Sequence, residues 1–349
     1  MVDSAVPENF LYAAGFSLRK RPLVRQFLNR DDVRFVRDVR KIPPGATVAV
    51  WASGPLGVGW EPDAETPPFK RIFLEDGFLR SVGLGADLIR PLSWVVDQQG
   101  IYYDASRPSD LEHLLQTTGF SASTLLRAAS MQQQLVATGL TKYNVGAGQW
   151  QRPAAAIGRE LVLVPGQVET DAAIRLGALG ITTNLALLQA ARAAHPAAWV
   201  IYKPHPDVVA GLRNSGAQEG DAAQWCNQIV TDVSMGALLD VVDVVHVLSS
   251  LAGFEALLRG KKVVCHGLPF YAGWGLTHDV LSTPRRTRCL SMDELVAGVL
   301  LEYPRYVSRV TRTPCTAEQA LSELIDWKAH VSARTPLWRK MLRPFIRHA

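Results

Sequence analysis

Ser249–Thr277, with the sequence SSLAGFEALLRGKKVVCHGLPFYAGWGLT, is the segment that indicates the fold most clearly. The apolar residues Val244, Val245 and Val247 precede it, so the sequence predicts a strand that runs into a helix beginning at the serine pair. A second short strand is expected at Val263–Cys265, followed by a loop crowded with Gly, Pro, Phe, Tyr and Trp. Strand, helix and strand in this order are typical of a parallel α/β sheet.

The serine pair predicts a nucleotide site at the carboxyl edge of that sheet. A helix N-terminus presents unpaired backbone N–H groups with a partial positive charge, and the hydroxyls of Ser249 and Ser250 complete a cradle for an anion. Glu255, about one turn into the same helix, can hold a ribose or a base amine. A simple N-cap is an equally good reading of the two serines.

Composition sets the outer limits. At 349 residues the chain is long enough for two domains, and its 48% hydrophobic content is typical of a globular protein. No run of about 20 apolar residues is present and the first nine residues do not resemble a secretory signal, so we expect neither a membrane span nor secretion. The four cysteines form no C-x-x-C pair, which favours reduced thiols in a cytoplasmic protein over a zinc site.

The formal net charge of +5 is unevenly placed. Residues 327–349 contain no acidic side chain, and their basic residues interleave with apolar ones at roughly helical spacing. This pattern predicts a helix on an anionic membrane surface, here the inner face of the cytoplasmic membrane. The alternative is a helix packed on its own domain with a solvated basic face. Nucleic acid is a poorer partner because no base-stacking or groove-reading motif accompanies the charge.

The chain divides near residue 155, after the Gly-, Ala- and Pro-rich segment Gly146–Ile157. Apolar runs before and after this point predict strands at Thr47–Ala52, Arg71–Leu74, Ser93–Val96, Glu160–Val164 and Ala198–Tyr202. We therefore expect an α/β protein with two Rossmann-like lobes and an active site in the cleft between them. The predicted ranges are 1–154 for the first lobe, 155–310 for the second, and 311–349 for a helical basic segment.

Polar loops at two expected strand ends of the second lobe carry candidate chemistry. The loop GQVETD places Asp171 after a buried strand, where a carboxylate can act as a nucleophile in glycosyl transfer. The alternative is that Asp171 caps the next helix. In KPHPD, His205 lies between two prolines on a rigid turn, where it can donate to a phosphate, act as an acid or be purely structural.

The first lobe offers the segment LEDGFLRS directly after a strand. Glu75 can accept a proton from an acceptor hydroxyl, and Arg80 can bind a sugar carboxylate through its planar fork. An ordinary turn with a surface ion pair is the alternative. In the aromatic loop, Tyr271 and Trp274 can form the floor of a sugar or base site, or can fill the core.

Six segments together resemble the capsule polysaccharide biosynthesis family typified by KpsC and LipA. They are LEDGFLRS, SWVVDQQGIYYD, GQVETD, YKPHPDV, SSLAGFEALLRGK and PFYAGWGLT, and they run in the family's order from about residue 72 to about residue 310. Members of the family are β-Kdo transferases, where Kdo is an eight-carbon acidic sugar of Gram-negative envelopes. Many members carry two modules, and this chain resembles a single one, the second.

The resemblance implies a GT-B-like glycosyltransferase that moves Kdo from CMP-Kdo to a lipid-linked, Kdo-containing acceptor with retention of configuration. It implies Asp171 as the nucleophile that carries a Kdo adduct, and we assign Glu75 as the base. The implied donor-binding residues are Gln167, Lys203, His205, Ser249, Ser250 and Glu255. The candidates for other substrate contacts are Arg80, Ser81, Tyr271 and Trp274.

No cofactor and no metal are expected, because CMP-Kdo lacks a diphosphate and the sequence has no convincing Asp-x-Asp motif. Other capsule biosynthesis proteins are expected partners. Two alternatives stay open. A glycerophosphotransferase acting on CDP-glycerol would share the frame, the cytidine site and the histidine, but would need no carboxylate nucleophile. A non-catalytic capsule assembly component would bind without turnover, although every motif residue is present.

Overall fold

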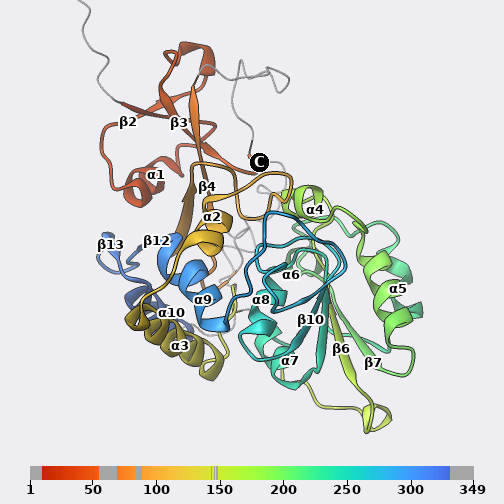
Figure 1. Cartoon of the computed structure of the whole chain (residues 1–349). Coiled ribbons are helices and arrows are strands. Elements are labelled where there is room, and N and C mark those ends of the chain that lie inside the picture. The colour runs from red at the N-terminus through yellow and green to blue at the C-terminus, as the bar shows by residue number, and fades with distance from the viewer. Residues whose placement is uncertain are drawn as a thin grey trace, which may run out of the picture.

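A computed structural model of the chain describes residues 10–54, 69–83, 89–142, 144, 146 and 148–330. These residues form two lobes, each built on one sheet with helices packed against it (Figure 1). The first sheet has seven strands in the order β13-β12-β5-β4-β3-β1-β2, and the second has six in the order β11-β10-β9-β6-β7-β8.

The first sheet is mixed. Its strands are β1 (Leu11–Ala14), β2 (Val33–Val36), β3 (Thr47–Trp51), β4 (Lys70–Asp76), β5 (Ser93–Asp97), β12 (Pro304–Val307) and β13 (Pro314–Cys315). The strands β1 to β4 run parallel, whereas β5 and β12 are antiparallel to their neighbours. The strands predicted around β3, β4 and β5 are confirmed. The sequence analysis missed β1 and β2, which are only four residues long.

Helices of the first lobe begin and end at clear signals. They are α1 (Arg21–Leu28), the short 3-10 helix η1 (Val39–Lys41), α2 (Asp110–Thr117) and α3 (Ala122–Ala137). Pro22 lies in the first turn of α1, and Asn29 ends that helix with a left-handed φ of 52°. Ser109 and Ser121 cap α2 and α3 by accepting bonds from backbone N–H groups.

The second sheet is wholly parallel. Its strands are β6 (Leu161–Pro165), β7 (Trp199–Lys203), β8 (Gln228–Ile229), β9 (Val244–Val247), β10 (Lys262–Cys265) and β11 (His278–Asp279). The chain runs outward from β6 through β7 to β8, then crosses back to β9 and continues outward on the other side. The neighbours β6 and β9 therefore flank a topological switch point, and the loops that follow them diverge to leave a crevice.

The helical elements of the second lobe are mostly short. They are η3 (Ala154–Ala156), α4 (Ala172–Gly177), α5 (Asn184–Ala194), α6 (Pro206–Val209), η4 (Glu219–Gln224), α7 (Met235–Val241) and α8 (Leu251–Leu257). The elements α4, α6 and α8 begin directly after the loops that follow β6, β7 and β9. These loops therefore emerge together at the carboxyl edge of the second sheet.

The chain returns to the first lobe near its end, which differs from the predicted ranges. The helix α9 (Met292–Val296) continues into a π-helical turn, η5 (Ala297–Glu302), and then into β12, which pairs with β5 of the first sheet. Residues 304–307 therefore belong to the first sheet and not to the second lobe. The helix α10 (Ala317–His330) buries its apolar face against the same lobe. The predicted ranges gave each lobe one continuous stretch of sequence, so they could not show that the chain returns to pair antiparallel with β5.

Part of the predicted basic segment can be placed. Lys328, on α10, donates from Nζ to the carbonyl oxygens of Thr138 and Gly139, both at 2.9 Å. Residues 331–349, which carry most of the charge predicted to face a membrane, lie outside the described residues. In the described part of the chain, no helix has the length and apolar character needed to cross a bilayer.

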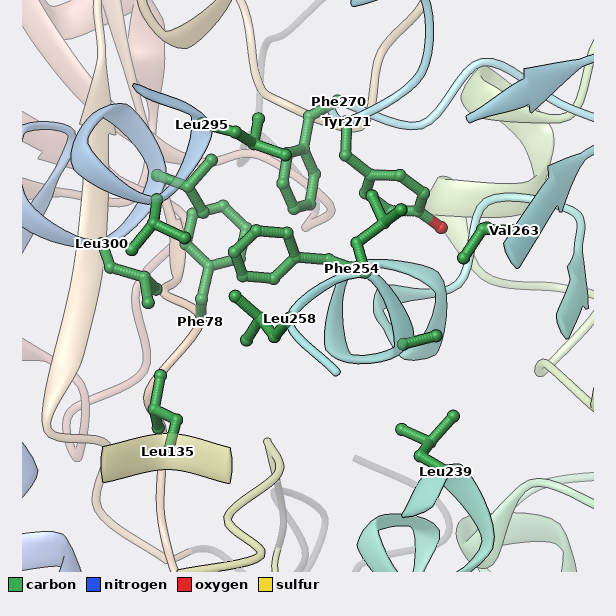
Figure 2. Packing of buried hydrophobic residues seen from close by; sticks show 14 of the residues in the cluster. Phe78, Leu135, Leu239, Phe254, Leu258, Val263, Phe270, Tyr271, Leu295 and Leu300 are labelled. Carbon is green, nitrogen blue, oxygen red and sulfur yellow. The ribbon is translucent and has the colours of Figure 1, made fainter. Parts of the chain in front are cut away.

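A shared core joins the lobes. Phe78, which follows β4, packs its ring against Phe270 of the aromatic loop at 4.7 Å and faces Phe254 of α8 at 6.4 Å between centroids. Figure 2 shows these three rings together, with leucines of α3, α9 and η5 around them. Aromatic contacts of this kind fix how the first lobe sits over the edge of the second sheet.

A buried ion cluster fixes the same arrangement. The Glu112 carboxylate of α2 accepts from Arg285 at 2.6 Å and from Arg286 at 2.8 Å, both from the segment after β11. Arg286 also donates to the carbonyl oxygens of Pro269 and Ala272, at 2.6 and 2.8 Å. The aromatic loop is thereby tied to the first lobe.

Candidate active site

One cleft lies at the carboxyl edge of the second sheet, under the first lobe. The loops after β6, β7 and β9 supply Gln167, Asp171, His205, Ser249 and Ser250 to its lining. Tyr102, Tyr103, Thr141 and Lys142 line it from the opposite side, and Pro269 and Phe270 close one end. The cleft therefore collects the second-lobe motifs at the switch point, where α/β proteins bind ligands.

The two serines of the pair have different roles, and the N-cap expected from the sequence is made by Ser250. Ser250 caps α8, because its Oγ accepts from the Ala252 N–H at 3.2 Å. Ser249 instead spans the switch point: its N–H donates to Gln167 Oε1 at 3.0 Å, and Gln167 Nε2 donates to Ser249 Oγ at 3.3 Å. Gln167 and Ser249 thus hold the loops after β6 and β9 together while both face the cleft.

The two carboxylates of GQVETD have different surroundings. Glu169 accepts backbone N–H bonds from Asn184 and Ala217, both at 2.7 Å, so it orders the loop. Asp171 occupies the N-cap position of α4, yet its side chain makes no capping bond and lines the cleft. Burial raises the pKa of Asp171, and the charges of Arg213 and Lys142 oppose that rise. Of the two carboxylates in this loop, Asp171 is therefore the one that faces the cleft.

His205 sits on the rigid turn that its flanking prolines predict. Its Nδ1 accepts from the Asp207 N–H at 3.2 Å, so a neutral ring carries its proton on Nε2. Burial lowers the pKa of His205 to about 4, helped by the positive charges of Lys142 and Arg213. At neutral pH the ring is uncharged, which suits it to donate a hydrogen bond to an anion rather than to act as an imidazolium acid.

Lys203 has a mainly structural position. Its Nζ donates to the carbonyl oxygens of Val233, at 2.7 Å, and Thr231, at 3.3 Å. Burial lowers the pKa of this ammonium, while Asp232 opposes the shift. Lys203 borders the cleft, but its charge is directed into the loop before α7.

Glu255 and Lys142 meet across the lobes. Glu255 is buried on α8, and its Oε1 accepts the backbone N–H of Lys142 at 2.7 Å. Burial raises the pKa of Glu255 to about 7. The positive charge of Lys142 also favours the ionised forms of Glu75 and Asp171. Sequence reasoning missed Lys142, because nothing around it in the chain marks it as part of a site.

Glu75 lies one layer behind the cleft surface. Its Oε1 accepts from the Asp76 N–H at 3.0 Å, and its Oε2 accepts from the Tyr103 hydroxyl at 3.1 Å. Burial, with the nearby charge of Asp76, raises the pKa of Glu75. Tyr103 lines the cleft and Glu75 does not. Tyr103 comes from the segment IYYD, and the composition of that segment did not mark Tyr103 as a residue between Glu75 and the cleft.

The remaining candidates are not among the lining residues. Arg80 is buried and pairs with Asp76 at 2.6 Å, and it donates to Ser81 Oγ at 3.0 Å. The Tyr271 hydroxyl donates to the Ser250 carbonyl, and Trp274 Nε1 donates to the Phe270 carbonyl at 2.8 Å. Both aromatic side chains are fully buried, so the core reading applies to them. Within the aromatic loop, Phe270 is the ring that reaches the cleft.

No three His, Cys, Asp or Glu side chains within the described ranges come together as a metal site. The expectation that the chain needs no metal or cofactor stays a prediction.

Comparisons with known proteins identify the family of this chain. A family model described as capsule polysaccharide biosynthesis protein matches residues 64–144 and 140–306, more than half of the chain. The chain belongs to this family. It is 42% identical over 325 residues, or 91% of its length, to the capsule polysaccharide modification protein LipA of Neisseria meningitidis serogroup A. It is 46% identical over 253 residues, or 72% of its length, to the lipopolysaccharide-processing protein LpsZ of Rhizobium meliloti.

These relatives are longer than the chain, which spans 46% of LipA and 58% of LpsZ. Two solved structures from Thermosulfurimonas dismutans match almost end to end, each covering 91% of this chain and 99% of its own. The KpsC β-Kdo 2,7 transferase is 36% identical with a TM-score of 0.75, and the KpsC β-Kdo 2,4 transferase is 33% identical with a TM-score of 0.78. The expected family and the expected GT-B-like α/β fold with its interlobe cleft are confirmed.

Proposed function

We propose that this chain is a retaining β-Kdo transferase that moves Kdo from CMP-Kdo to a lipid-linked, Kdo-containing acceptor in capsular or surface polysaccharide biosynthesis. The observation that carries the proposal is the convergence of Asp171, His205 and the Ser249–Glu255 motif on one cleft at the switch point. The match to two β-Kdo transferase structures across 91% of the chain supports the same assignment.

The cleft suits the chemistry of this donor. CMP-Kdo carries a phosphodiester and a sugar carboxylate, so its site must offer hydrogen-bond donors and positive charge. His205 offers its Nε2 proton, Ser250 offers a hydroxyl, and Lys142 brings a cation to the same cleft. The Glu255 carboxylate is an acceptor for ribose hydroxyls or a base amine. None of these contacts needs a metal ion.

Asp171 is the proposed nucleophile. Its carboxylate attacks the anomeric carbon of Kdo, the bond to the phosphate breaks, and CMP leaves with the electron pair. The acceptor hydroxyl then attacks the same carbon from the opposite face and releases the Asp171 carboxylate. Two displacements, each with inversion, give overall retention.

Glu75 is the proposed base in the second displacement. Burial raises the pKa of Glu75, which makes its carboxylate a stronger base toward a hydroxyl proton. Because Tyr103 separates Glu75 from the cleft, we place the acceptor hydroxyl against the Tyr103 hydroxyl, which takes its proton while passing its own proton to Glu75. The chain would work at the inner face of the cytoplasmic membrane, where a lipid-linked acceptor is found, beside other capsule biosynthesis proteins.

A transfer assay tests the proposal. CMP-Kdo is generated in place and offered with a Kdo-primed acceptor, and the product is examined by NMR. A β-linked Kdo on the acceptor supports retaining transfer, whereas an α-linked product contradicts it. Turnover of CDP-glycerol instead would favour the glycerophosphotransferase. Binding of CMP with no turnover of either donor would favour a non-catalytic assembly component.

A further inference from the structure

A second cavity, on the first lobe, is rich in arginine. Three elements border it: the segment before β5, the turn between β12 and β13, and the end of α10. Its lining residues are Ile89, Arg90, Pro91, Leu92, Arg309, Arg312 and Trp327. Three guanidinium groups thus converge on a space whose described lining contains no carboxylate.

Within the described part of the chain, the side chains of Arg90 and Arg309 bind neutral groups. Arg90 donates to the neutral side-chain oxygen of Gln26, and the Arg309 guanidinium stacks 4.7 Å from the centre of the Trp327 ring. Across the described ranges, no carboxylate forms an ion pair with Arg90, Arg309 or Arg312.

Glu323 is an acidic group close to this turn, and its oxygens are already used. They accept from Ser308 Oγ and from the Arg309 backbone N–H, both at 2.6 Å. This carboxylate therefore orders the backbone of the β12–β13 turn instead of pairing with the guanidinium groups.

A bound anion would stabilise this arginine cluster. Burial lowers the pKa of Arg90, and the like charge of Arg312 lowers it further. Arg312 itself has a φ of 67°, a left-handed conformation that few residues other than glycine adopt. Like charges brought together without a counter-ion repel one another, and a bound oxyanion removes that repulsion.

The cavity lies at the same end of the first sheet as the proposed base. The Leu92 N–H donates to the Arg80 carbonyl at 2.9 Å, and Arg80 pairs with Asp76, which follows Glu75. On the other side, the Val307 N–H donates to the Leu92 carbonyl at 2.9 Å. The arginine cluster and Glu75 therefore lie at the same hydrogen-bonded end of the first sheet.

We propose that Arg90, Arg309 and Arg312 form a subsite for a carboxylate of the acceptor's acidic sugar chain, at a sugar behind the one that reacts. The inference rests on the proposed function for the identity of the acceptor. A planar guanidinium matches a carboxylate through two parallel hydrogen bonds, and several acidic sugars in a row present one carboxylate each. The subsite would select acceptors that are already acidic and would leave the donor site unaffected.

Kinetics with a double variant test the subsite. Arg309→Gln/Arg312→Gln removes two charges from exposed positions, and Arg127→Gln is the matched control, an exposed arginine of α3 paired with Glu318. For an acceptor with several Kdo units, we expect the double variant to raise KM about tenfold or more. The KM for CMP-Kdo and the release of CMP without acceptor should stay at wild-type values. Equal acceptor KM values in the double variant and the wild type would overturn the proposal.

Binding measurements separate this proposal from the proposed function. Calorimetry with a lipid-free Kdo oligosaccharide needs no turnover, so it reports on the subsite even if the chain transfers nothing. We expect binding by the wild type and by Arg127→Gln, and at least tenfold weaker binding by the double variant at an unchanged melting temperature. Absent or equal binding would overturn the subsite.

Sedimentation with phosphatidylglycerol vesicles then distinguishes the source of the oxyanion. If the double variant loses vesicle binding but keeps oligosaccharide binding, the cluster recognises a lipid phosphate, and the sugar-carboxylate assignment is wrong. If oligosaccharide binding falls while vesicle binding is kept, the assignment to the sugar chain stands.

Discussion

The two sheet edges that meet at the cleft were equally well marked in the sequence, and they differ in structure. At the second-lobe edge, Asp171, His205 and Ser250 follow parallel strands and all line the cleft. At the first-lobe edge, Glu75 is covered by Tyr103, and Arg80 is buried against Asp76. The difference comes from topology. The second sheet is wholly parallel, whereas in the first sheet β5 runs back antiparallel beside β4, and β12 pairs with β5.

This contrast indicates that residues following a strand are accessible to a ligand only where the loops after neighbouring strands diverge. They diverge at the switch point between β6 and β9, so short side chains there face open space. In the first lobe, the residue after β4 hydrogen-bonds directly to the start of β5, through Gly77 N–H to the Ser93 carbonyl at 3.0 Å. Four predictions, given in order of decreasing expected effect, test this contrast.

Asp171→Asn should remove nearly all transfer, by roughly 10⁴-fold in kcat, because an amide cannot replace a carboxylate nucleophile. Glu169→Gln is the matched control, since that neighbouring carboxylate binds only backbone N–H groups among its described contacts. Its kcat should stay within about tenfold of wild type. Steady-state rates of CMP release measure both, and equal losses in the two variants would refute the distinction drawn within this loop.

Glu112→Gln tests whether the ion cluster of Glu112, Arg285 and Arg286 holds the two lobes together. Removing the charge leaves the buried Arg286 and the half-buried Arg285 without their counter-ion, so we expect the free energy of unfolding to fall by about 3–5 kcal/mol. Glu318→Gln breaks an exposed pair with Arg127 and should cost no more than about 1 kcal/mol. Urea denaturation compares the two, and similar losses would show that the buried cluster does not hold the lobes together.

Tyr103→Phe tests the first-lobe edge, where Tyr103 covers Glu75. The Tyr103 hydroxyl donates to Glu75 and so favours its ionised form. Without that bond the pKa of Glu75 should rise further, and the acid limb of the rate profile should move to higher pH. We expect kcat near pH 7 to fall by roughly 10–100-fold, with the KM for CMP-Kdo unchanged. Glu75→Gln should be inactive at every pH, and an unshifted profile in Tyr103→Phe would separate Tyr103 from the base.

His246 gives a pH test within the second lobe but away from the cleft. Its ring contacts those of His195 and His266, each at 3.0 Å, and burial with these neighbours lowers its pKa to about 3. The unfolded chain binds a proton near pH 6.5, whereas the folded chain does not, so stability is full above that pH and falls as the pH drops toward 3.

His246→Gln should flatten this acid dependence by up to about 1.4 kcal/mol per pH unit between pH 6 and pH 4. The measurement is the slope of unfolding free energy against pH, because the variant also loses hydrogen bonds at every pH. His205, whose pKa is about 4, adds a similar slope and is the internal comparison. An unchanged slope in His246→Gln would mean that this cluster takes up protons without unfolding.

Much of the second lobe could be predicted from sequence because its signals are local. A buried strand, a polar loop and a helix start fall within a dozen residues around Asp171 and again around Ser250, and the parallel sheet fixes where such loops emerge. The return of β12 to the first sheet could not be predicted in this way, because it depends on antiparallel pairing with a strand about 200 residues away.

The missed site residues depend on the path of the chain in space. Lys142 reaches the cleft because Glu255, more than 100 residues later, holds its backbone N–H. Tyr271 and Trp274 have the composition of a sugar platform, but their polar atoms donate to nearby carbonyls and their rings fill the core. Whether an aromatic side chain faces a ligand or the interior is decided by packing, which local composition does not encode.

The covalent role of Asp171 is the central claim, and intact-protein mass spectrometry tests it most directly. The purified chain and its Asp171→Asn variant are each mixed with CMP-Kdo generated in place, without acceptor. A mass gain of one Kdo unit in the wild type, absent in the variant, is the predicted result. An adduct of equal yield in the variant, or none in a wild type that still transfers Kdo to an acceptor, would contradict it.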